Sequence, residues 1–297
     1  MRHGVLILPE ERWSSAREKW VHAERLGFDH AWMYDHLSWR WFRDKPWFSL
    51  VPTLTAAALA TSRLRIGTMV ASPGNRHPVP FAKDLMTIDD ISGGRVIAGI
   101  GAGAGGFDDE VLGQPGLSKK ERADRFREFV ELTAKLLEQP VTDYQGRYFT
   151  TTGARVIPAC VQQPRVPIAV AALGPRGIRL AAEHADIWVT IAWPGHGEPY
   201  RYEQAVPVIR EQTVLFEKEC ESVGRDPASV RRLVVTGARI GGVTESVETY
   251  SDACGLFEEA GVTDIVVHWP RPDFPYQGSV DVLEDIAASV LAPAVTT

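Results

Sequence analysis

The feature that most constrains this chain is an alternation of short apolar runs with longer amphipathic stretches along nearly its whole length. The apolar runs have the length of buried strands, and the amphipathic stretches have the length of helices that cover one face of a sheet. Strands that alternate with helices in this way are typical of βα units and predict a parallel sheet. The eight units favour a single (β/α)8 TIM barrel over a doubly wound sheet of about six strands.

The expected strands are Gly4–Leu8, His30–Tyr34, Leu64–Ala71, Arg95–Gly101, Val166–Ala171, Asp186–Ile191, Arg232–Ile240 and Asp264–Val267. The expected helices are Ser14–Leu26, Phe48–Thr61, Val79–Ile91, Lys119–Glu138, Pro175–Glu183, Tyr200–Val223, Glu245–Gly261 and Val280–Leu291. A hairpin is expected at 141–150, and rim loops and insertions are expected near 36–47, 102–118 and 139–165. Because no Gly/Ser-rich or Pro-rich linker interrupts the units, residues 1–297 are predicted to form one domain.

Charge and cysteine content exclude several classes of function. The chain has 38 acidic and 32 basic residues, so it has no basic excess with which to neutralise the phosphates of a nucleic acid. Its three cysteines, Cys160, Cys220 and Cys254, are far apart, which disfavours a disulfide framework and a thiolate zinc site. The apolar run at the start is too short for a signal peptide or a membrane span. We therefore expect a cytoplasmic enzyme that acts on a small molecule.

In a (β/α)8 barrel the chemistry lies at the carboxyl ends of the strands. The candidate segments are therefore those that directly follow the expected strands. They are Tyr34-Asp35-His36, Ala71-Ser72-Pro73, Gly101-Ala102-Gly103, Ala172-Leu173-Gly174-Pro175, Ala192-Trp193 and His268-Trp269-Pro270-Arg271.

His36 is the strongest candidate for acid–base chemistry. Imidazole titrates near neutral pH, and the adjacent Asp35 is placed to orient the ring or a ligand. The alternative is a histidine that only forms hydrogen bonds at a strand end. Aromatic residues nearby favour a pocket for an apolar or conjugated ligand. They are Trp32, Tyr34, Trp39, Trp41, Phe42, Trp47 and Phe48, of which Trp32 also fits the barrel core.

Two glycine-containing segments suggest contacts with a ligand. Leu173–Gly177 leads straight into a helix, so free amides, the helix dipole and Arg176 converge on a place that suits a phosphate. The alternative is an ordinary βα turn with a solvated arginine. The segment 101–106 satisfies GxGxxG, but the next expected helix begins more than ten residues later, unlike in a dinucleotide-binding fold. Its glycines fit better as a place where the backbone approaches a flat ligand.

A metal site and a serine hydrolase are disfavoured alternatives. His36, His77 and His268 occur singly, without an HxH pair on the first strand and without HExxH. A GxSxG elbow is also absent from the sequence. We therefore expect no metal among the groups that carry the chemistry.

The order and spacing of several short motifs resemble the bacterial luciferase superfamily of flavin- or deazaflavin-dependent oxidoreductases. The likeness runs from Val5 to about His268. Its motifs are Glu24–Asp29, Asp35-His36, Thr61–Thr68, His77–Lys83, Ile91–Arg95, Val170–Arg176 and Ala185–Trp188. The resemblance implies a TIM barrel that binds a flavin-type ring over the strand ends, usually as a homodimer.

The resemblance also assigns residues to the cofactor. In relatives, the strand end that matches Met69–Ser72 supports the ring, often through a non-prolyl cis peptide, and the loop that matches Leu173–Gly177 holds the phosphate. The implied cofactor-binding residues are Asp35, Met69, Val70, Ala71, Ser72, Gly101, Gly103, Ala172, Leu173, Gly174, Pro175, Arg176 and Gly177.

The pair Asp35-His36 matches one that several members place beside coenzyme F420, an 8-hydroxy-5-deazaflavin. The resemblance therefore implies an F420-dependent oxidoreductase. An FMN-dependent monooxygenase and a flavin-binding protein without catalysis are the alternatives. Sugar-phosphate dehydrogenases of this group carry a glutamate where this chain has Ala104. A reductase of an activated C=C or C=N bond is therefore favoured, with His36 as the proton donor.

The expected substrate is a bulky or aromatic small molecule or a modified peptide. Its predicted pocket walls are Trp39, Trp41, Trp193 and Trp269. Arg271 is a candidate anchor for a substrate anion, and the alternative is a solvated arginine at the rim.

Overall fold

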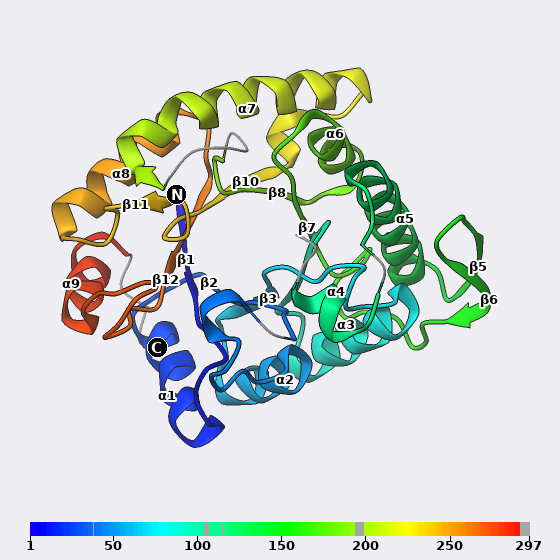
Figure 1. The fold of residues 1–297 in the computed structure, drawn as a ribbon, viewed down its shortest axis with the longest axis horizontal. Coiled ribbons are helices and arrows are strands. Elements are labelled where there is room, and N and C mark those ends of the chain that lie inside the picture. Colours follow the sequence, from blue (N-terminus) through cyan, green and yellow to red (C-terminus); the bar gives the residue numbers. More distant parts are fainter. Residues whose placement is uncertain (38, 104–106, 115, 194–198, 292–297) are drawn as a thin grey trace. The chain divides into compact units, whose positions relative to one another are not determined.

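The computed structural model describes residues 1–37, 39–103, 107–114, 116–193 and 199–291. Eight strands form a closed barrel in the order β1, β12, β10, β8, β7, β4, β3, β2 (Figure 1). Their bounds are β1 Arg2–Leu6, β2 His30–Met33, β3 Arg65–Thr68, β4 Val96–Gly101, β7 Ile168–Ala171, β8 Ile187–Thr190, β10 Arg231–Val235 and β12 Asp264–His268. Neighbouring strands pair in parallel, as between β1 and β12 and between β4 and β7. The predicted (β/α)8 barrel is confirmed.

Helices follow the barrel strands where the amphipathic stretches predict them. They are α1 Trp13–Arg25, α2 Leu50–Ala60, α3 Pro78–Ser92, α5 Lys119–Glu138, α6 Pro175–His184, α7 Tyr202–Ser222, α8 Val247–Glu259 and α9 Val280–Val290. Their ends differ from the expected ends by only a few residues, because capping contacts rather than the apolar pattern decide where a helix stops.

The expected strand at 232–240 is too long. It ends at Val235, because Gly237 has a φ of +92° and its N–H donates to the Ile240 carbonyl at 2.7 Å. The chain then forms the short strand β11, Ile240–Gly241, which pairs with β9, Tyr200–Arg201. The helix expected from residue 200 therefore begins two residues later.

The rim segments contain more regular structure than the sequence predicted. The segment 102–118 includes a short helix, α4 Phe107–Val111, and residues Arg40–Phe42 form one turn of 3-10 helix. The hairpin extends beyond its expected end, since β5 Val141–Gln145 pairs antiparallel with β6 Thr150–Arg155. In Figure 1 this hairpin lies beside α5.

The chain divides into two compact units. The first unit comprises Met1–Ile7, Glu18–Trp32 and Ala172–Thr297, and the second comprises Leu8–Arg17 and Met33–Ala171. The assignment of residues 1–297 to one domain stays a prediction.

In the second unit, local contacts fix the start and end of the helices that follow β3 and β4. α3 begins at Pro78, where a missing N–H costs nothing, and it ends at Gly93 with a φ of +64°. α5 begins with a capping box, in which the Ser118 Oγ accepts from the Glu121 N–H at 3.2 Å and the Glu121 carboxylate accepts from the Ser118 N–H at 3.1 Å. These helix starts fix the positions of the loops that carry candidate site residues.

In the first unit, α6, α7, α8 and α9 pack one after another along the chain. An aromatic pair joins this layer to the barrel, because Trp188 of β8 stacks on Phe216 of α7 with centroids 4.9 Å apart and planes 10° apart. Both side chains are buried.

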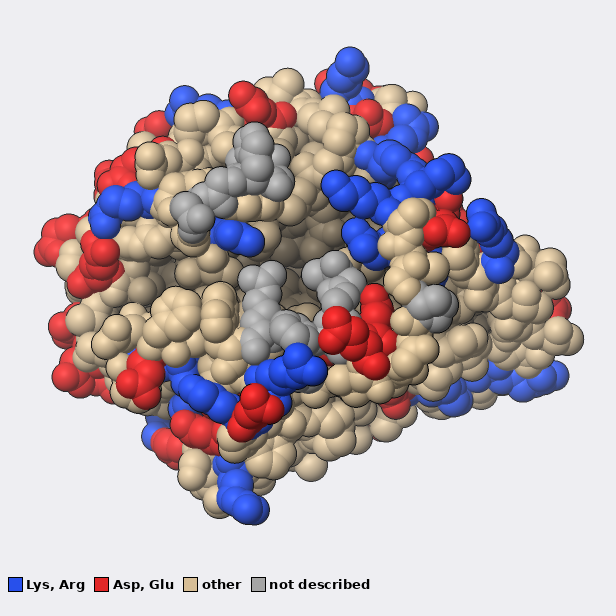
Figure 2. All heavy atoms as spheres, viewed as in Figure 1, with Lys and Arg blue, Asp and Glu red and all other residues tan. Residues whose placement is uncertain are grey.

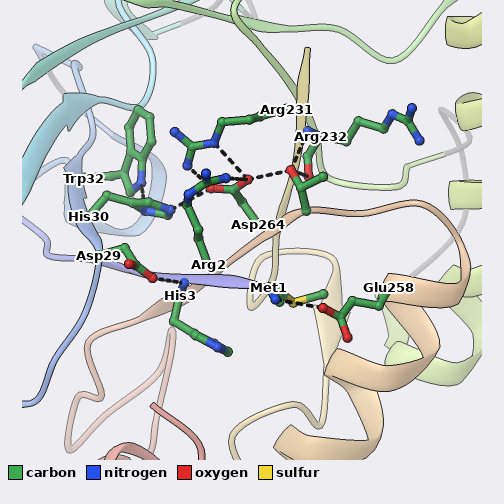
Figure 3. Close-up of polar contacts among 11 residues, drawn as sticks. Met1, Arg2, His3, Asp29, His30, Trp32, Arg231, Arg232, Glu258 and Asp264 are labelled. Atoms are coloured by element: carbon green, nitrogen blue, oxygen red, sulfur yellow. Dashed lines mark hydrogen bonds and ion pairs between the residues drawn. The ribbon is translucent and has the colours of Figure 1, made fainter. Parts of the chain in front are cut away.

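A buried polar cluster joins the amino ends of β2, β10 and β12 in the first unit (Figure 3). The Nδ1 of His30 accepts from the Trp32 indole N–H at 2.7 Å, and Nε2 lies 3.1 Å from Asp264 Oδ1. An indole N–H only donates, so His30 carries its proton on Nε2 and donates it to the carboxylate. Arg231 donates to both oxygens of Asp264, and the Thr263 hydroxyl donates to Oδ2 at 2.6 Å.

Within the described residues, no helix combines the length and apolar character needed to cross a bilayer. On the face drawn in Figure 2, Lys and Arg side chains lie among Asp and Glu side chains, and neither sign covers that face. This mixture agrees with the small net charge of −6.

Candidate functional site

His36 lies just beyond β2, at the carboxyl end of that strand, with 27% of its side chain exposed. Its Nδ1 is 2.7 Å from Asp108 Oδ2, and its carbonyl accepts from the Trp47 indole N–H at 2.8 Å. The ring is therefore held at one nitrogen, while a quarter of the side chain stays open to solvent or a ligand.

The partner of His36 is a residue that the sequence did not single out. Asp108 lies in α4, and its other oxygen, Oδ1, accepts from the Leu37 N–H at 2.8 Å. Asn75, from the loop after β3, donates to Asp108 Oδ2 at 3.3 Å. The only hint in the sequence was the acidic run after the strand 4 glycines, and nothing there indicates which acid faces a histidine.

Asp35 is buried and forms an ion pair with Arg76. The guanidinium donates to Oδ2 at 2.8 Å from Nε and to Oδ1 at 2.7 Å from Nη2. This two-point contact raises the pKa of Arg76, although burial opposes the shift. Asn75 also donates to the Asp35 carbonyl at 3.1 Å. The Asp35 carboxylate is therefore directed at Arg76, and its assignment to the cofactor stays a prediction.

Tryptophans that follow His36 in the sequence also lie near it in the structure. Trp39 stacks on the imidazole with centroids 6.0 Å apart, and Trp47 packs on Trp39 at 5.8 Å. Trp41 meets Trp39 edge-on at 5.5 Å and is 48% exposed. Trp32, by contrast, is fully buried in the barrel. The structure thus brings Trp39 and Trp41 together beside His36, whereas their role toward a substrate stays a prediction.

The ends of β3 and β4 meet in the second unit. The peptide bond between Met69 and Val70 is cis, as the resemblance implied. The Ala71 carbonyl accepts from the Gly101 N–H at 2.9 Å, and a Cβ added to Gly101 would overlap Val70 Cγ2. A side chain at position 101 would therefore require Val70 or the strand to move.

Ser72 and Gly103 lie just beyond these two strand ends. Ser72 is buried, and its carbonyl accepts from the Asn75 and Arg76 N–H groups at 3.1 and 3.0 Å. Gly103 has a φ of +73°, and a Cβ there would lie 3.3 Å from Ser72 Oγ. Of the predicted cofactor residues at these two strand ends, Ala71, Ser72, Gly101 and Gly103 are small, and Gly103 is exposed. Ala104 lies outside the described residues.

In the first unit, the turn that precedes α6 is the place where a phosphate contact was predicted. Gly174 is the N-cap and provides no side-chain cap, so the first N–H groups of the helix have no capping side chain. The Leu173 carbonyl accepts from Gln212 Nε2 at 3.2 Å, and the Ala172 carbonyl accepts from the Trp188 indole N–H at 2.9 Å. Gly177 packs against Ala172, where an added Cβ would lie 3.0 Å from the alanine Cβ.

Trp193, Trp269 and Arg271 also lie in the first unit. The Arg239 guanidinium lies 3.9 Å from the centre of the Trp193 ring. Trp193 also stacks with Tyr200, with ring centroids 6.3 Å apart. Trp269 is 6% exposed, which gives it little surface for a substrate. Arg271 is buried, and its Nη1 donates to the Asp273 and Pro275 carbonyls at 2.9 and 3.0 Å. The alternative of a solvated arginine is therefore wrong, and the predicted anion contact would have to compete with these carbonyls.

Residues 1–240 match the family model described as luciferase-like monooxygenase. The 5,10-methylenetetrahydromethanopterin reductase of Methanopyrus kandleri is 32% identical over 219 residues, which cover 70% of this chain and 59% of that protein. The F420-dependent glucose-6-phosphate dehydrogenase of Amycolatopsis mediterranei is 32% identical over 208 residues, which cover 69% of this chain and 61% of that protein. The matched region thus spans about three-fifths of the length of these relatives.

Among solved structures, an F420-dependent secondary alcohol dehydrogenase in complex with an F420–acetone adduct superposes with a TM-score of 0.80. The match covers 100% of this chain and 99% of that chain at 21% identity. At this level of identity, the likeness shows a shared fold.

Proposed function

Because this chain belongs to the luciferase-like monooxygenase family, we propose that it is an F420-dependent oxidoreductase acting on a bulky or aromatic organic substrate. We propose more specifically a reductase of an activated C=C or C=N bond. Among the relatives at 32% identity, one is named as an F420-dependent dehydrogenase and another as a reductase.

The observation that carries the proposal is the setting of His36. The imidazole is partly exposed at a strand end, held at Nδ1 by Asp108 and stacked on Trp39. A histidine held in this way has one nitrogen, Nε2, with which to exchange a proton. His30, by contrast, is fully buried, and both of its ring nitrogens are hydrogen-bonded within the protein.

The ends of β3 and β4 fit a flat ring. Gly101 and Gly103 have no side chains, and the neighbouring Ala71 and Ser72 are small and buried. A flat conjugated ligand needs such a surface, because a branched side chain would hold the ring away from the backbone. Beside them, Asn75 Oδ1 is buried without a hydrogen-bond partner in the described part of the chain, which leaves an acceptor for a donor group on a ligand.

The turn before α6 fits a phosphate. Its uncapped N–H groups carry the positive end of the helix dipole, and Arg176 in the first turn adds a full charge. In the proposal, this turn binds the phosphate of the cofactor through Gly174, Arg176 and Gly177.

When bound, a deazaflavin supplies a hydride in its reduced form and accepts one in its oxidised form. In the reducing direction, His36 Nε2 donates a proton to the substrate atom next to the carbon that receives the hydride. Trp39 and Trp41 line the approach and limit the access of water. The absence of a glutamate at position 104 removes the acid that the related sugar-phosphate dehydrogenases carry, and this favours reduction.

Titration of the purified protein with coenzyme F420 and with FMN, followed by fluorescence, tests the choice of cofactor. We expect saturable binding of F420 and at least tenfold weaker binding of FMN. A variant with Gly174→Asp, which places a negative charge in the proposed phosphate turn, should weaken F420 binding. Tight FMN binding without F420 binding would contradict the proposal.

The family description also supports a second candidate, an FMN-dependent monooxygenase. That enzyme would consume oxygen when supplied with reduced FMN, whereas the proposed reductase turns over anaerobically with reduced F420. A protein that binds either cofactor without turnover would be the non-catalytic alternative.

The substrate and the assembly complete the proposal. A panel of aromatic imines, enoates and dehydroamino-acid peptides, screened anaerobically for oxidation of reduced F420, tests whether the substrate is a small molecule or a modified peptide. We also propose a homodimer, as the resemblance implies. Sedimentation velocity would distinguish a dimer of about 66 kDa from the 32.8 kDa monomer.

A further inference from the structure

The contacts around His36 define which of its two ring nitrogens carries a proton. Nδ1 lies 2.7 Å from Asp108 Oδ2, a distance typical of a charge-assisted hydrogen bond. An ionised carboxylate only accepts hydrogen bonds, so the proton in this contact belongs to Nδ1. Nε2 is then the nitrogen that exchanges a proton.

Asp108 is itself fixed by contacts at both oxygens. Oδ1 accepts from the Leu37 N–H at 2.8 Å, and Oδ2 accepts from Asn75 Nδ2 at 3.3 Å in addition to its contact with His36. Only 17% of its side chain is exposed. Donors from two separate segments thus prevent the carboxylate from rotating away from the imidazole.

The neighbouring acid does not share this arrangement. Asp109 makes a different contact, since its Oδ1 lies 3.1 Å from the position of a Cβ added to Gly74. Its charge favours the protonated form of Arg125, although burial lowers the pKa of that guanidinium overall. The two adjacent aspartates therefore offer a matched pair of positions, one in contact with the imidazole and one not.

From this geometry we infer that Asp108 is a positioning residue, which holds His36 in the tautomer with the proton on Nδ1 and directs Nε2 toward the reacting atoms. The inference rests on the proposed role of His36 and names the residue on which that role depends. In the reducing direction, Nε2–H gives its proton to the substrate and Nε2 retains the electron pair of the broken N–H bond. The Nδ1–H bond to Asp108 persists throughout and stabilises the imidazolium before the transfer.

The tautomer can be measured without any cofactor. In protein labelled with ¹⁵N-histidine, the multiple-bond ¹H–¹⁵N spectrum distinguishes Nδ1–H from Nε2–H rings, and His36→Gln identifies the signals of His36 by their loss. In the unaltered protein at pH 8, we expect His36 to have the proton on Nδ1. A neutral ring with its proton on Nε2 would overturn the inference without any further variant.

Two variants then test whether Asp108 determines the tautomer of His36. Asp108→Leu should convert His36 to the Nε2–H form, which is the commoner tautomer in water, whereas Asp109→Leu should leave the signals of His36 unchanged. An unchanged tautomer in Asp108→Leu would overturn the inference. If the leucine variant does not fold, Asp108→Ser serves in its place, and the same change is expected from it.

Turnover gives the final measurement. With reduced F420 and any substrate found by the panel, Asp108→Asn should lower kcat about 10²-fold or more and change KM less than threefold. Equal kcat values for Asp108→Asn and Asp109→Asn would overturn the inference. Failure to bind F420 would contradict the proposed function instead, and the tautomer measurement would still decide the role of Asp108.

Discussion

At the scale of single residues, neighbours in the sequence turn out to have different surroundings. Asp35 and His36 are adjacent, yet Asp35 is buried against Arg76, whereas His36 is partly exposed and contacts Asp108. The pattern Asp-His therefore combines a structural ion pair and a candidate acid. Sequence alone suggested that both residues face one ligand.

Replacement of His36 by Gln should separate binding from chemistry. The amide keeps a polar side chain but cannot donate a proton as a general acid, so we expect turnover to fall about 10²- to 10⁴-fold. Binding of F420, measured by fluorescence, should change less than threefold. His184→Gln, on the last turn of α6, is the control and should keep full activity. Full activity in His36→Gln would exclude this residue as the proton donor.

Replacement of Asp35 by Ala should mainly affect stability. The Arg76 guanidinium would lose both of its hydrogen bonds to the carboxylate, at a cost of about 3 kcal/mol in the free energy of unfolding. Glu18→Ala, which breaks the exposed pair with Arg25, should cost under about 1 kcal/mol. Urea denaturation of the two variants measures the difference, and equal losses would contradict the structural role of Asp35.

At the scale of elements, glycines stand at the end of β4 and at the start of α6. At both places the backbone is either closely packed or left without a capping side chain. Gly101 has no room for a Cβ, and Gly174 leaves the first N–H groups of α6 without a side-chain cap. Closely approached or uncapped backbone is what the proposed contacts with a flat ring and a phosphate would use.

Gly101→Ala should disturb the end of β4. Its added Cβ would overlap Val70 Cγ2, so either Val70 or the strand must move. We expect a loss of about 1–3 kcal/mol of stability, typical of an overpacked site, and weaker binding of F420. Gly116→Ala is the control, since a Cβ there meets nothing within 4 Å. Thermal unfolding and the fluorescence titration give the two measurements, and wild-type values for Gly101→Ala would show that the strand end is not tightly packed.

At the scale of the whole molecule, buried ionisable groups tie stability to pH. Burial lowers the pKa of His268 to about 3 and also lowers the pKa of His30. Burial opposes ionisation of Asp264, but hydrogen bonds from His30 and Arg231 hold the pKa of that carboxyl well below its usual range. The stability that Asp264 contributes is thus present above about pH 3.9 and is lost as the pH falls below it.

His268 and His30 change the free energy of unfolding over a higher pH range than Asp264 does. They are neutral in the folded chain but bind protons in the unfolded chain below about pH 6.5, so acid favours unfolding. His268→Phe keeps a ring on Tyr276 and removes this titration. Between pH 6 and pH 5, the free energy of unfolding should therefore fall by about 1 kcal/mol less in the variant than in the unaltered protein. Urea denaturation at the two pH values measures both slopes, and equal slopes would contradict the shift.

Sequence by itself determined the order of strands and helices, the barrel, and which segments follow the strand ends. The order of strands and helices is local, because apolar periodicity and turn residues act over a few neighbouring positions, and the barrel followed from the count of eight such units. The rim was predicted less well, since α4 and the pair β9–β11 depend on contacts that no short pattern contains.

Only the tertiary structure decided how the candidate side chains are paired. His36 and Asp108 are 72 residues apart, and Asp35 and Arg76 are 41 residues apart, so no spacing rule links them. A hydrogen bond needs its two atoms within about 3 Å, and only the folded backbone brings such distant residues to that distance. The sequence therefore proposed His36 as a proton donor, and only the fold brings the Asp108 carboxylate to its Nδ1.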